Sequence, residues 1–270
     1  MKAFCIDLDG TLLRSDKTVS NINKDSIRKA IDEGNKVFLV TGRPYCFTKY
    51  IAEEIHNEIE IISFNGGCYD KGKDTIINCI SNDSLIEAID ILKDSKCKCF
   101  FKGKRFFYTT EDYDDRFLYD HMNDKFSDKL KVYSYIKLSW DEIRKNAKDI
   151  IKILIYSYDK NEVDKLRIKM QRIKGLTNSS YMDISLDINS ENTDKGRAVR
   201  DVMNYYEINK SDIVAIGDSE NDIPMLKEAG YSIAMGNAKE EIKEICDKVT
   251  LSNDEDGVSY AIEKIINLED

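Results

Sequence analysis

After Met1 the chain continues with Lys2-Ala3-Phe4-Cys5-Ile6-Asp7-Leu8-Asp9-Gly10-Thr11. The part up to Leu8 is a short apolar run that ends among acidic residues, a pattern typical of a strand buried inside a parallel sheet. A carboxylate at the end of a buried strand is costly unless it has a partner. Ligands of open parallel sheets bind beyond the carboxyl ends of the strands. The run therefore predicts both a central strand and a site at its end.

The residues that follow alternate between helical and strand patterns. Helical spacing over 23–33 ends at Gly34, a typical C-cap residue, and the apolar run 36–40 follows it. A second helical pattern covers 47–56, and a third apolar run covers 59–63. Strands that alternate with helices predict a parallel sheet with right-handed crossovers.

From about residue 82 to 188 the pattern is mixed. Apolar positions over 85–92 predict a helix, and the runs 97–101 and 106–109 flank Lys102-Gly103-Lys104 as in a hairpin. The run 181–188 predicts another strand. Hairpins combined with helices indicate an α+β domain whose sheet is largely antiparallel.

The parallel pattern returns near Asn192, with buried strands predicted over 213–216 and 231–235. We therefore expect an α/β protein: a doubly wound, Rossmann-like parallel-sheet core from residues 1–81 and 189–270. The α+β domain of residues 82–188 is inserted into this core.

The composition, with 41% hydrophobic and 34% charged residues, is that of a globular protein. No stretch approaches the roughly 20 apolar residues that span a bilayer, and Asp7 comes too early for a signal peptide. A cytoplasmic protein without membrane partners is expected. The net charge of −9 argues against nucleic acid as a partner. The seven cysteines include no Cys-x-x-Cys pair, which argues against a zinc site.

Polar clusters follow three of the predicted strands. They are Asp7-Leu8-Asp9, Thr41-Gly42-Arg43 and Gly217-Asp218-Ser219. Strands that end at Asp7 and Asp218 can place two carboxylates side by side, and carboxylate oxygens suit Mg²⁺. The sequence therefore predicts a magnesium site at this edge of the sheet.

Such a site suits phosphoryl transfer. The Asp7 carboxylate can attack phosphorus to form an aspartyl-phosphate, while Mg²⁺ offsets the repulsion between the two anions. Asp9 can protonate the leaving oxygen and later activate water. Gly10 allows a tight turn, and Thr11 can donate a hydrogen bond that fixes Asp9. Thr41 can donate to a phosphate oxygen, and Lys195 can add a positive charge.

At this point the residues resemble a known family. The run that starts at Asp7 is similar to the first motif of the haloacid dehalogenase (HAD) superfamily, and Thr41-Gly42-Arg43 resembles the second motif. Lys195-Gly196 resembles the third motif and residues 217–222, Gly-Asp-Ser-Glu-Asn-Asp, the fourth. The Cof-type subfamily, of C2-capped IIB type, has signatures similar to three further stretches. These are Asn65-Gly66-Gly67, Gly236-Asn237-Ala238 and Asp256-Gly257-Val258.

The resemblance implies roles for these residues. Asp7 would be the nucleophile and a magnesium ligand, and Asp9 the general acid and base with its backbone carbonyl on the metal. Asp218 would bind the metal, and Asp222 the metal or a metal-bound water. The expected phosphate- and substrate-binding set is Leu8, Gly10, Thr11, Thr41, Gly42, Arg43, Asn65, Lys195 and Asn221.

Three members of that set have a simpler explanation. Arg43 can form a salt bridge, and Asn65 can be a turn former beside Gly66-Gly67. Lys195 can be a solvated residue in the first turn of a helix, although the helix dipole disfavours a cation there.

The position of the insertion, between Asn65 and Lys195, resembles that of a C2-type cap of the Cof-type subfamily. Such a cap would exclude water and select the leaving group. The resemblance implies a Mg²⁺-dependent phosphatase of small phosphorylated metabolites: sugar phosphates first, then nucleotides, flavin mononucleotide or pyridoxal phosphate. A sugar phosphomutase and a regulator that binds a phosphorylated ligand are the alternatives.

Overall fold

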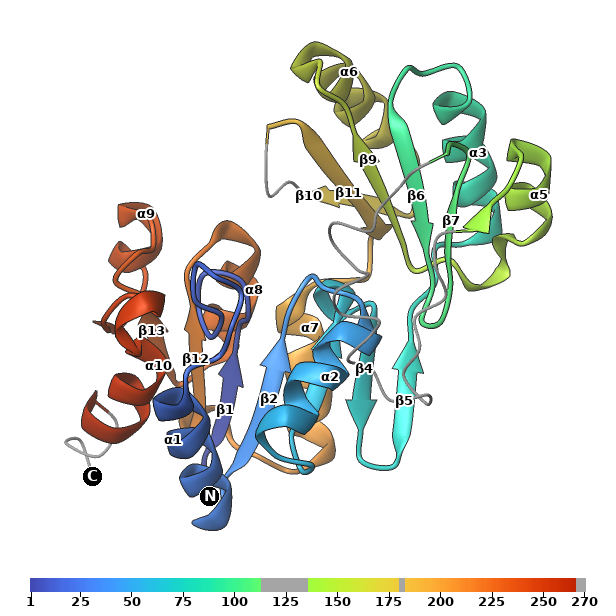
Figure 1. Ribbon diagram of the computed structural model, residues 1–270. Helices are drawn as coiled ribbons and strands as arrows, with labels where there is room; N and C mark the ends of the chain where they lie inside the picture. Colours follow the sequence, from blue (N-terminus) through green and yellow to red (C-terminus); the bar gives the residue numbers. More distant parts are fainter. Residues whose placement is uncertain (113–135, 180–182, 266–270) are drawn as a thin grey trace. The chain divides into compact units, whose positions relative to one another are not determined.

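The structure, a computed structural model, describes residues 1–112, 136–179 and 183–265 (Figure 1). The chain divides into two compact units, one of Met1–Ile76 with Asp194–Asp270 and the other of Ile77–Thr193. The expected insertion over 82–188 falls inside the second unit, and its role as a cap stays a prediction.

Eight strands form the sheet of the first unit. They are β1 (Ala3–Ile6), β2 (Lys36–Val40), β3 (Glu60–Ser63), β4 (Cys68–Lys71), β5 (Asp74–Ile77), β12 (Ile213–Gly217), β13 (Tyr231–Ala234) and β14 (Lys248–Val249). Their order in the sheet is β14-β13-β12-β1-β2-β3-β4-β5. The six strands from β14 to β3 are parallel, which confirms the predicted doubly wound core. Strand β4 runs antiparallel to β3, and neither β4 nor β5 was predicted, because both are short and partly polar.

Helices cover both faces of this sheet (Figure 1). They are α1 (Asn21–Asp32), α2 (Tyr45–Ile55), α7 (Lys195–Tyr205), α8 (Ile223–Glu228), α9 (Glu240–Glu244) and α10 (Gly257–Tyr260), which continues into a π-helical turn (Ala261–Ile265). Strand β1 alternates between the two faces. Phe4 and Ile6 pack in the core beneath α1 and α2, and Ala3 and Cys5 pack in the core beneath α7 and α8. Every residue of β1 is therefore buried, as its apolar run predicts.

The second unit has a six-stranded sheet, and its described helices share one hydrophobic core with that sheet. Its strands are β6 (Lys98–Lys102), β7 (Phe107–Thr109), β8 (Ile136–Lys137), β9 (Lys152–Tyr156), β10 (Leu176–Ser179) and β11 (Ser185–Ser190). Its helices include α3 (Asn82–Leu92), α5 (Trp140–Lys145) and α6 (Lys160–Met170). The strand order is β10-β11-β9-β6-β7-β8, antiparallel except for β7 and β8. The predicted hairpin is β6 and β7, and the strand predicted over 181–188 begins at Ser185, while residues 181–182 lie outside the described residues.

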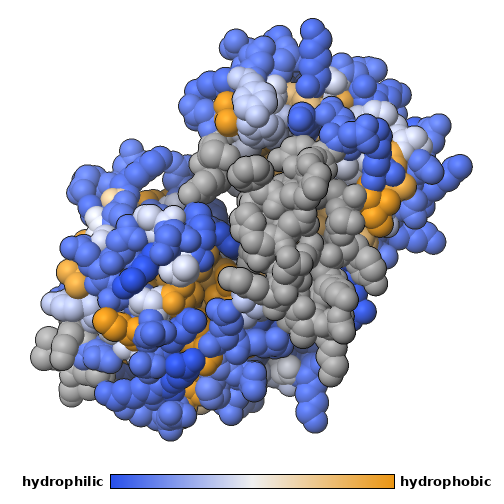
Figure 2. All heavy atoms as spheres, in the orientation of Figure 1, coloured by the Kyte–Doolittle hydropathy of each residue, from blue (hydrophilic) through white to orange (hydrophobic). Residues whose placement is uncertain are grey.

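No helix among the described residues is long and apolar enough to cross a membrane. Figure 2 shows the face of the molecule that is turned to the viewer in Figure 1. The described side chains there are mostly hydrophilic, with hydrophobic residues in small separate areas. Single exposed hydrophobic residues are normal on globular proteins and need no partner to explain them.

Candidate active site

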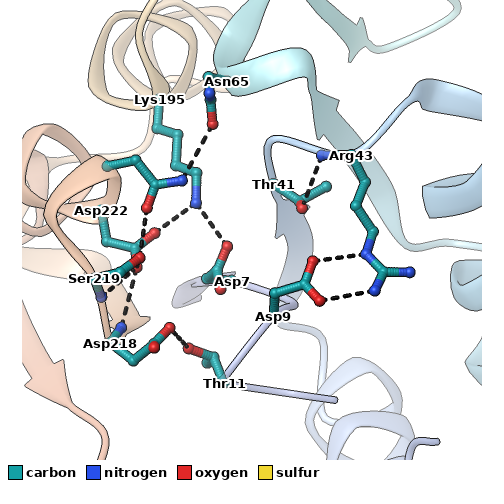
Figure 3. Close-up of polar contacts among 11 residues, drawn as sticks. Asp7, Asp9, Thr11, Thr41, Arg43, Asn65, Lys195, Asp218, Ser219 and Asp222 are labelled. Carbon is teal, nitrogen blue, oxygen red and sulfur yellow. Dashed lines mark hydrogen bonds and ion pairs between the residues drawn. The ribbon is translucent and has the colours of Figure 1, made fainter. Parts of the chain in front are cut away.

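Three adjacent parallel strands carry the polar clusters at their carboxyl ends. Asp7 follows β1, Thr41 follows β2 and Asp218 follows β12, and the order β12-β1-β2 makes these strands neighbours. The amide of Asp7 donates to the carbonyl oxygen of Ile216 (3.0 Å), and the amide of Thr41 donates to that of Ile62 (2.8 Å). The backbones of Asp7 and Thr41 are thus still hydrogen-bonded to the neighbouring strands. The three clusters lie together at the carboxyl ends of the strands (Figure 3).

Lys195 lies between two of the carboxylates, those of Asp7 and Asp222. It is the first residue of α7, it is fully buried, and its Nζ donates to Asp7 Oδ1 and to Asp222 Oδ1, both at 2.6 Å (Figure 3). Helix α7 can pack closely on α8 because residue 196 is glycine: a Cβ there would come within 2.4 Å of the Pro224 carbonyl oxygen. The interpretation of Lys195 as a solvated first-turn residue is wrong.

Asp222 is held by its own loop as well as by Lys195. Its Oδ2 accepts from the amides of Asp218 and Ser219, both at 3.0 Å. A Cβ on residue 217 would lie 2.7 Å from the Cβ of Asp222, so only glycine fits at the end of β12. These contacts fix the loop that presents Asp218.

Thr11 and Gly10 both lie against the Asp218 carboxylate. The Thr11 hydroxyl donates to Asp218 Oδ1 (3.1 Å), so the expectation that it would fix Asp9 is wrong. The fold brings the loop after β1 against the end of β12, and Asp218 is the carboxylate that this loop meets. Gly10 has φ +81°, and a Cβ there would lie 2.4 Å from Asp218 Oδ2. Leu8 is fully buried in the hydrophobic core, so only its backbone can take part in the site.

Asp9 points away from this cluster toward Arg43 (Figure 3). Arg43 Nε donates to Asp9 Oδ2 (2.6 Å) and Nη2 donates to Asp9 Oδ1 (2.7 Å), so the predicted salt bridge of Arg43 is with Asp9. Lys17 adds a longer contact to Asp9 Oδ1 (3.3 Å). No sequence signal pointed to Lys17, because the loop that brings it back to Asp9 has no regular spacing.

Asn65 occupies a strained turn beside the second motif. Phe64 and Asn65 have φ angles of 53° and 55°, which non-glycine residues rarely adopt. The Asn65 amide donates to the Thr41 carbonyl oxygen (2.9 Å), and the Phe64 amide donates to that of Arg43 (3.0 Å). A Cβ on Gly42 would meet the Asn65 side chain at 3.0 Å. Asn65 is thus a turn former, as one interpretation held, and its side chain also borders the site.

Asn221 and Thr41 are the remaining predicted phosphate-binding residues of the site. Asn221 Nδ2 donates to Asn65 Oδ1 (3.4 Å), and Asn221 Oδ1 accepts from the Ser219 hydroxyl (2.6 Å). The Thr41 hydroxyl oxygen is buried and accepts from the Arg43 amide (3.1 Å). A hydroxyl that accepts can still donate its own proton. The roles of these residues in binding phosphate stay predictions.

Burial and neighbouring charges shift the pKa values of the ionisable groups at the site. Burial, and then repulsion by Asp222, raises the pKa of Asp7 well above its usual range. Burial and Asp222 also raise the pKa of Asp218, to about 6. Burial alone would lower the pKa of Lys195, but Asp222 and Asp7 raise it above its ordinary value. For Asp9, burial is outweighed by hydrogen bonds and charge from Arg43 and by Lys17, so its pKa is lowered.

The carboxylates of Asp7, Asp218 and Asp222 offer ligand atoms that all lie within 4.8 Å of one another. Lys195 pairs with Asp7 and Asp222 and not with Asp218, so this group of three carboxylates carries an excess of negative charge, which a divalent cation would neutralise. Both oxygens of Asp222 already accept hydrogen bonds, so Asp7 and Asp218 are better placed to contact an ion directly. The cluster fits a hard divalent cation.

Asn237 is a further residue of the site that sequence reasoning did not place there. Its Nδ2 donates to the Gly10 carbonyl oxygen (2.8 Å), and its Oδ1 accepts from the Asn253 amide (3.0 Å). The motif Gly236-Asn237-Ala238 was the available signal, but the motif does not say what Asn237 contacts.

Comparison with known proteins agrees with this geometry. A family model described as haloacid dehalogenase-like hydrolase matches residues 4–262. The phosphatase YwtE of Bacillus subtilis is 29% identical over 298 aligned positions, which cover 99% of both chains. The phosphatase YwpJ of the same organism is 30% identical and covers 98% of this chain and all of its own. A solved haloacid dehalogenase-like hydrolase from B. subtilis, 28% identical, covers 98% of this chain and 100% of its own with a TM-score of 0.84.

The match to the family model extends over both units, and the motifs of the sequence meet at one edge of one sheet. The chain therefore belongs to the haloacid dehalogenase-like hydrolase family, in the Cof-type branch that its motifs predict, and it is a phosphomonoester hydrolase.

Proposed function

We propose that this chain is a Mg²⁺-dependent phosphatase of small phosphorylated metabolites that acts through an aspartyl-phosphate on Asp7. The observation that carries the proposal is the position of Asp7. It is buried at the end of β1, held by Lys195 at 2.6 Å, and grouped with Asp218 and Asp222. A carboxylate in such surroundings is oriented for attack and is not solvated by bulk water.

The reaction has two halves. In the first, an oxygen of Asp7 forms a bond to phosphorus, the bond to the leaving oxygen breaks, and Asp9 gives that oxygen a proton. In the second, Asp9 takes a proton from water as the water oxygen bonds to phosphorus, and the bond between phosphorus and Asp7 breaks. The products are an alcohol and phosphate, and both aspartates return to their starting states.

The remaining residues position the reacting groups. Lys195 holds Asp7, and the Thr41 hydroxyl and the backbone around Gly42 would donate hydrogen bonds to the phosphate oxygens. Asp7 and Asp218, with the backbone carbonyl of Asp9, would hold Mg²⁺, and Asp222 would orient them. When bound, Mg²⁺ supplies positive charge that attracts the phosphate and stabilises the charge that develops during transfer.

Sugar or polyol phosphates are the substrate class that we propose first. The relative YwtE is named a 5-amino-6-(5-phospho-D-ribitylamino)uracil phosphatase, which is an enzyme for a phosphorylated polyol chain. Nucleotides, flavin mononucleotide and pyridoxal phosphate follow. We propose that the leaving group is selected by residues 77–193, whose mixed pattern of helices and strands differs from that of the core.

The test is phosphate release across a panel of phosphorylated metabolites, with Mg²⁺ and with excess chelator. We expect release that needs Mg²⁺ and that falls by at least about 10⁴-fold in Asp7→Asn, as when other covalent nucleophiles are removed. Full activity in that variant would refute the proposal. An isomeric sugar phosphate as the main product would instead favour the mutase alternative. Tight binding without turnover would favour the regulator alternative.

A further inference from the structure

Arg43 and Asp9 form a two-point contact across the site. Nε and Nη2 of Arg43 donate to the two oxygens of Asp9 at 2.6 and 2.7 Å, and the two side chains are 23% and 27% exposed. A planar guanidinium that meets a carboxylate in this way fixes both the position and the plane of the carboxylate. A single-point contact such as that of Lys17 at 3.3 Å cannot fix the plane.

The backbone of Arg43 is itself fixed. Its amide donates to Thr41 Oγ1 (3.1 Å), and its carbonyl oxygen accepts from the Phe64 amide (3.0 Å). Phe64 lies in the turn with positive φ angles that follows β3. Asp9 belongs to the loop after β1, so the salt bridge ties that loop to the ends of β2 and β3.

This contact leaves one acceptor position of the Asp9 carboxylate open. Both carboxylate oxygens accept from Arg43, which leaves no place for a proton on the bonded side of the group. A carboxylate offers about four acceptor positions, and the bonds from Arg43 and Lys17 fill three of them. The remaining position, on Oδ2, is where a water can donate its proton.

The same contact argues against Arg43 as a phosphate ligand. To bind phosphate with both of these N–H groups, Arg43 would have to release Asp9. The side chains of Lys195 and Thr41 have no contact with Asp9, so in the proposed function they would contact the phosphate without such a rearrangement.

We propose that Arg43 is a positioning residue that holds the Asp9 carboxylate as the base of the second half-reaction, in which water releases phosphate from Asp7. The inference rests on the proposed function, because it assigns Arg43 a part in one half of that reaction. It replaces the expectation that Arg43 binds phosphate.

The experiment is rapid-quench kinetics of Arg43→Ala and Arg43→Lys with p-nitrophenyl phosphate and Mg²⁺. Nitrophenolate leaves without a proton from Asp9, so the first half-reaction persists in both variants. In Arg43→Ala we expect a burst of one nitrophenolate per active site, followed by a steady rate about 10²-fold below wild type. Intact-protein mass after acid quench should show the phosphorylated enzyme accumulating on Asp7.

Two further readouts separate positioning from a structural effect. Guanidinium added at millimolar concentration should restore part of the steady rate of Arg43→Ala, and Arg43→Lys should fall between the two proteins. Arg200→Ala is the matched control, because Arg200 also contacts a carboxylate with Nε and Nη2, that of Glu228 on the outside of the core. It should leave both half-reactions unchanged.

Other results would overturn the inference. A raised KM without burst or phosphorylated enzyme would make Arg43 a phosphate ligand. An equal loss in both half-reactions, with a lower denaturation midpoint and no rescue, would make its role structural. If Arg43→Ala does not fold, Arg43→Lys decides between these outcomes by the same measurements. Failure of the proposed function itself would look different, since wild-type enzyme would then release phosphate without needing Asp7.

Discussion

Lys195 shows how one buried residue can hold an active site together. Its ammonium lies between Asp7 and Asp222, and all three side chains are almost completely buried. A buried ion pair adds little net stability compared with apolar packing, but removal of one partner leaves a buried charge without compensation. We therefore expect stability and catalysis to depend on the same side chain.

Lys195→Met should destabilise the fold by about 3–5 kcal/mol at neutral pH and abolish phosphatase activity. Urea denaturation measures the first effect and phosphate release the second. Lys71→Met is the control, because the pair of Lys71 with Asp201 (2.9 Å) is partly exposed and should cost at most about 1 kcal/mol. Equal losses in the two variants would contradict the role given to Lys195.

Gly10→Ala tests the close approach of the loop after β1 to Asp218. The positive φ alone should cost about 1–2 kcal/mol, and the Cβ would in addition displace the Asp218 carboxylate. We expect kcat/KM to fall by at least about 10²-fold, because Asp218 would hold the metal and the same loop carries Asp9. Gly34→Ala is the matched control: its φ is +88°, but nothing lies within 4 Å of the added Cβ. Because of its positive φ, Gly34→Ala should lose a similar amount of stability, but it should keep full activity. A loss of activity in Gly34→Ala would contradict the role given to Gly10.

Among the elements, the loop after β1 is fastened to the C-terminal part of the core. Asn237 and Asn253 donate to the carbonyl oxygens of Gly10 (2.8 Å) and Leu13 (2.9 Å), and Arg14 pairs with Asp256 (2.7 Å). These contacts join residues more than 220 positions apart in the chain. They explain why two stretches that resemble Cof-type signatures, 236–238 and 256–258, lie against the loop that carries Asp9 although they are far from it in sequence.

Asn237→Ala removes the bond to Gly10 and the bond that Asn237 accepts from the Asn253 amide. Because the Asn237 side chain is exposed, the change should cost about 1 kcal/mol. It should also lower kcat, because the loop that carries Asp9 loses its support. Asn35→Ala is an unusually close control. Asn35 also bridges two backbone groups, the carbonyl oxygen of Ala30 (3.0 Å) and the amide of Lys2 (2.9 Å), but near the amino ends of β1 and β2. It should lose as much stability, measured by urea denaturation, with no change in kcat.

For the whole molecule, the excess of negative charge at the site makes stability depend on pH and on metal. Without metal, the folded-state pKa of Asp218 is about 6 and the ordinary value is 3.8. The folded state therefore binds more protons than the unfolded state in this interval, and stability falls as pH rises from about 4 to 6. Above that interval the cost is constant, and a bound divalent cation offsets it.

We expect Asp218→Asn, in excess chelator, to be more stable than wild type at pH 8 and to lose this advantage by about pH 4. Mg²⁺ at about 100 times its Kd should stabilise wild type by about 2.7 kcal/mol and the variant by much less. Urea denaturation at both pH values, with and without Mg²⁺, measures these differences. An unchanged midpoint of wild type on addition of Mg²⁺ would contradict the metal site.

The sequence by itself determined the parallel core, the strand ends that carry Asp7, Thr41 and Asp218, and the family to which these motifs belong. It could do so because a buried strand needs a continuous apolar run, and a polar residue at its end stands out against that run. The short strands β4 and β5 escaped prediction, since their partly polar residues are buried only by the rest of the sheet.

Only the tertiary structure decided which polar groups meet. Thr11 donates a hydrogen bond to Asp218 and not to Asp9. Arg43 donates to Asp9, and Asn237 donates to the carbonyl oxygen of Gly10, which is distant in the chain. The physical reason is the range of the interactions. Burial and periodicity act between neighbours in the chain and can be read from it, whereas a hydrogen bond of about 3 Å depends on where two distant backbones are brought by the packing of the whole core.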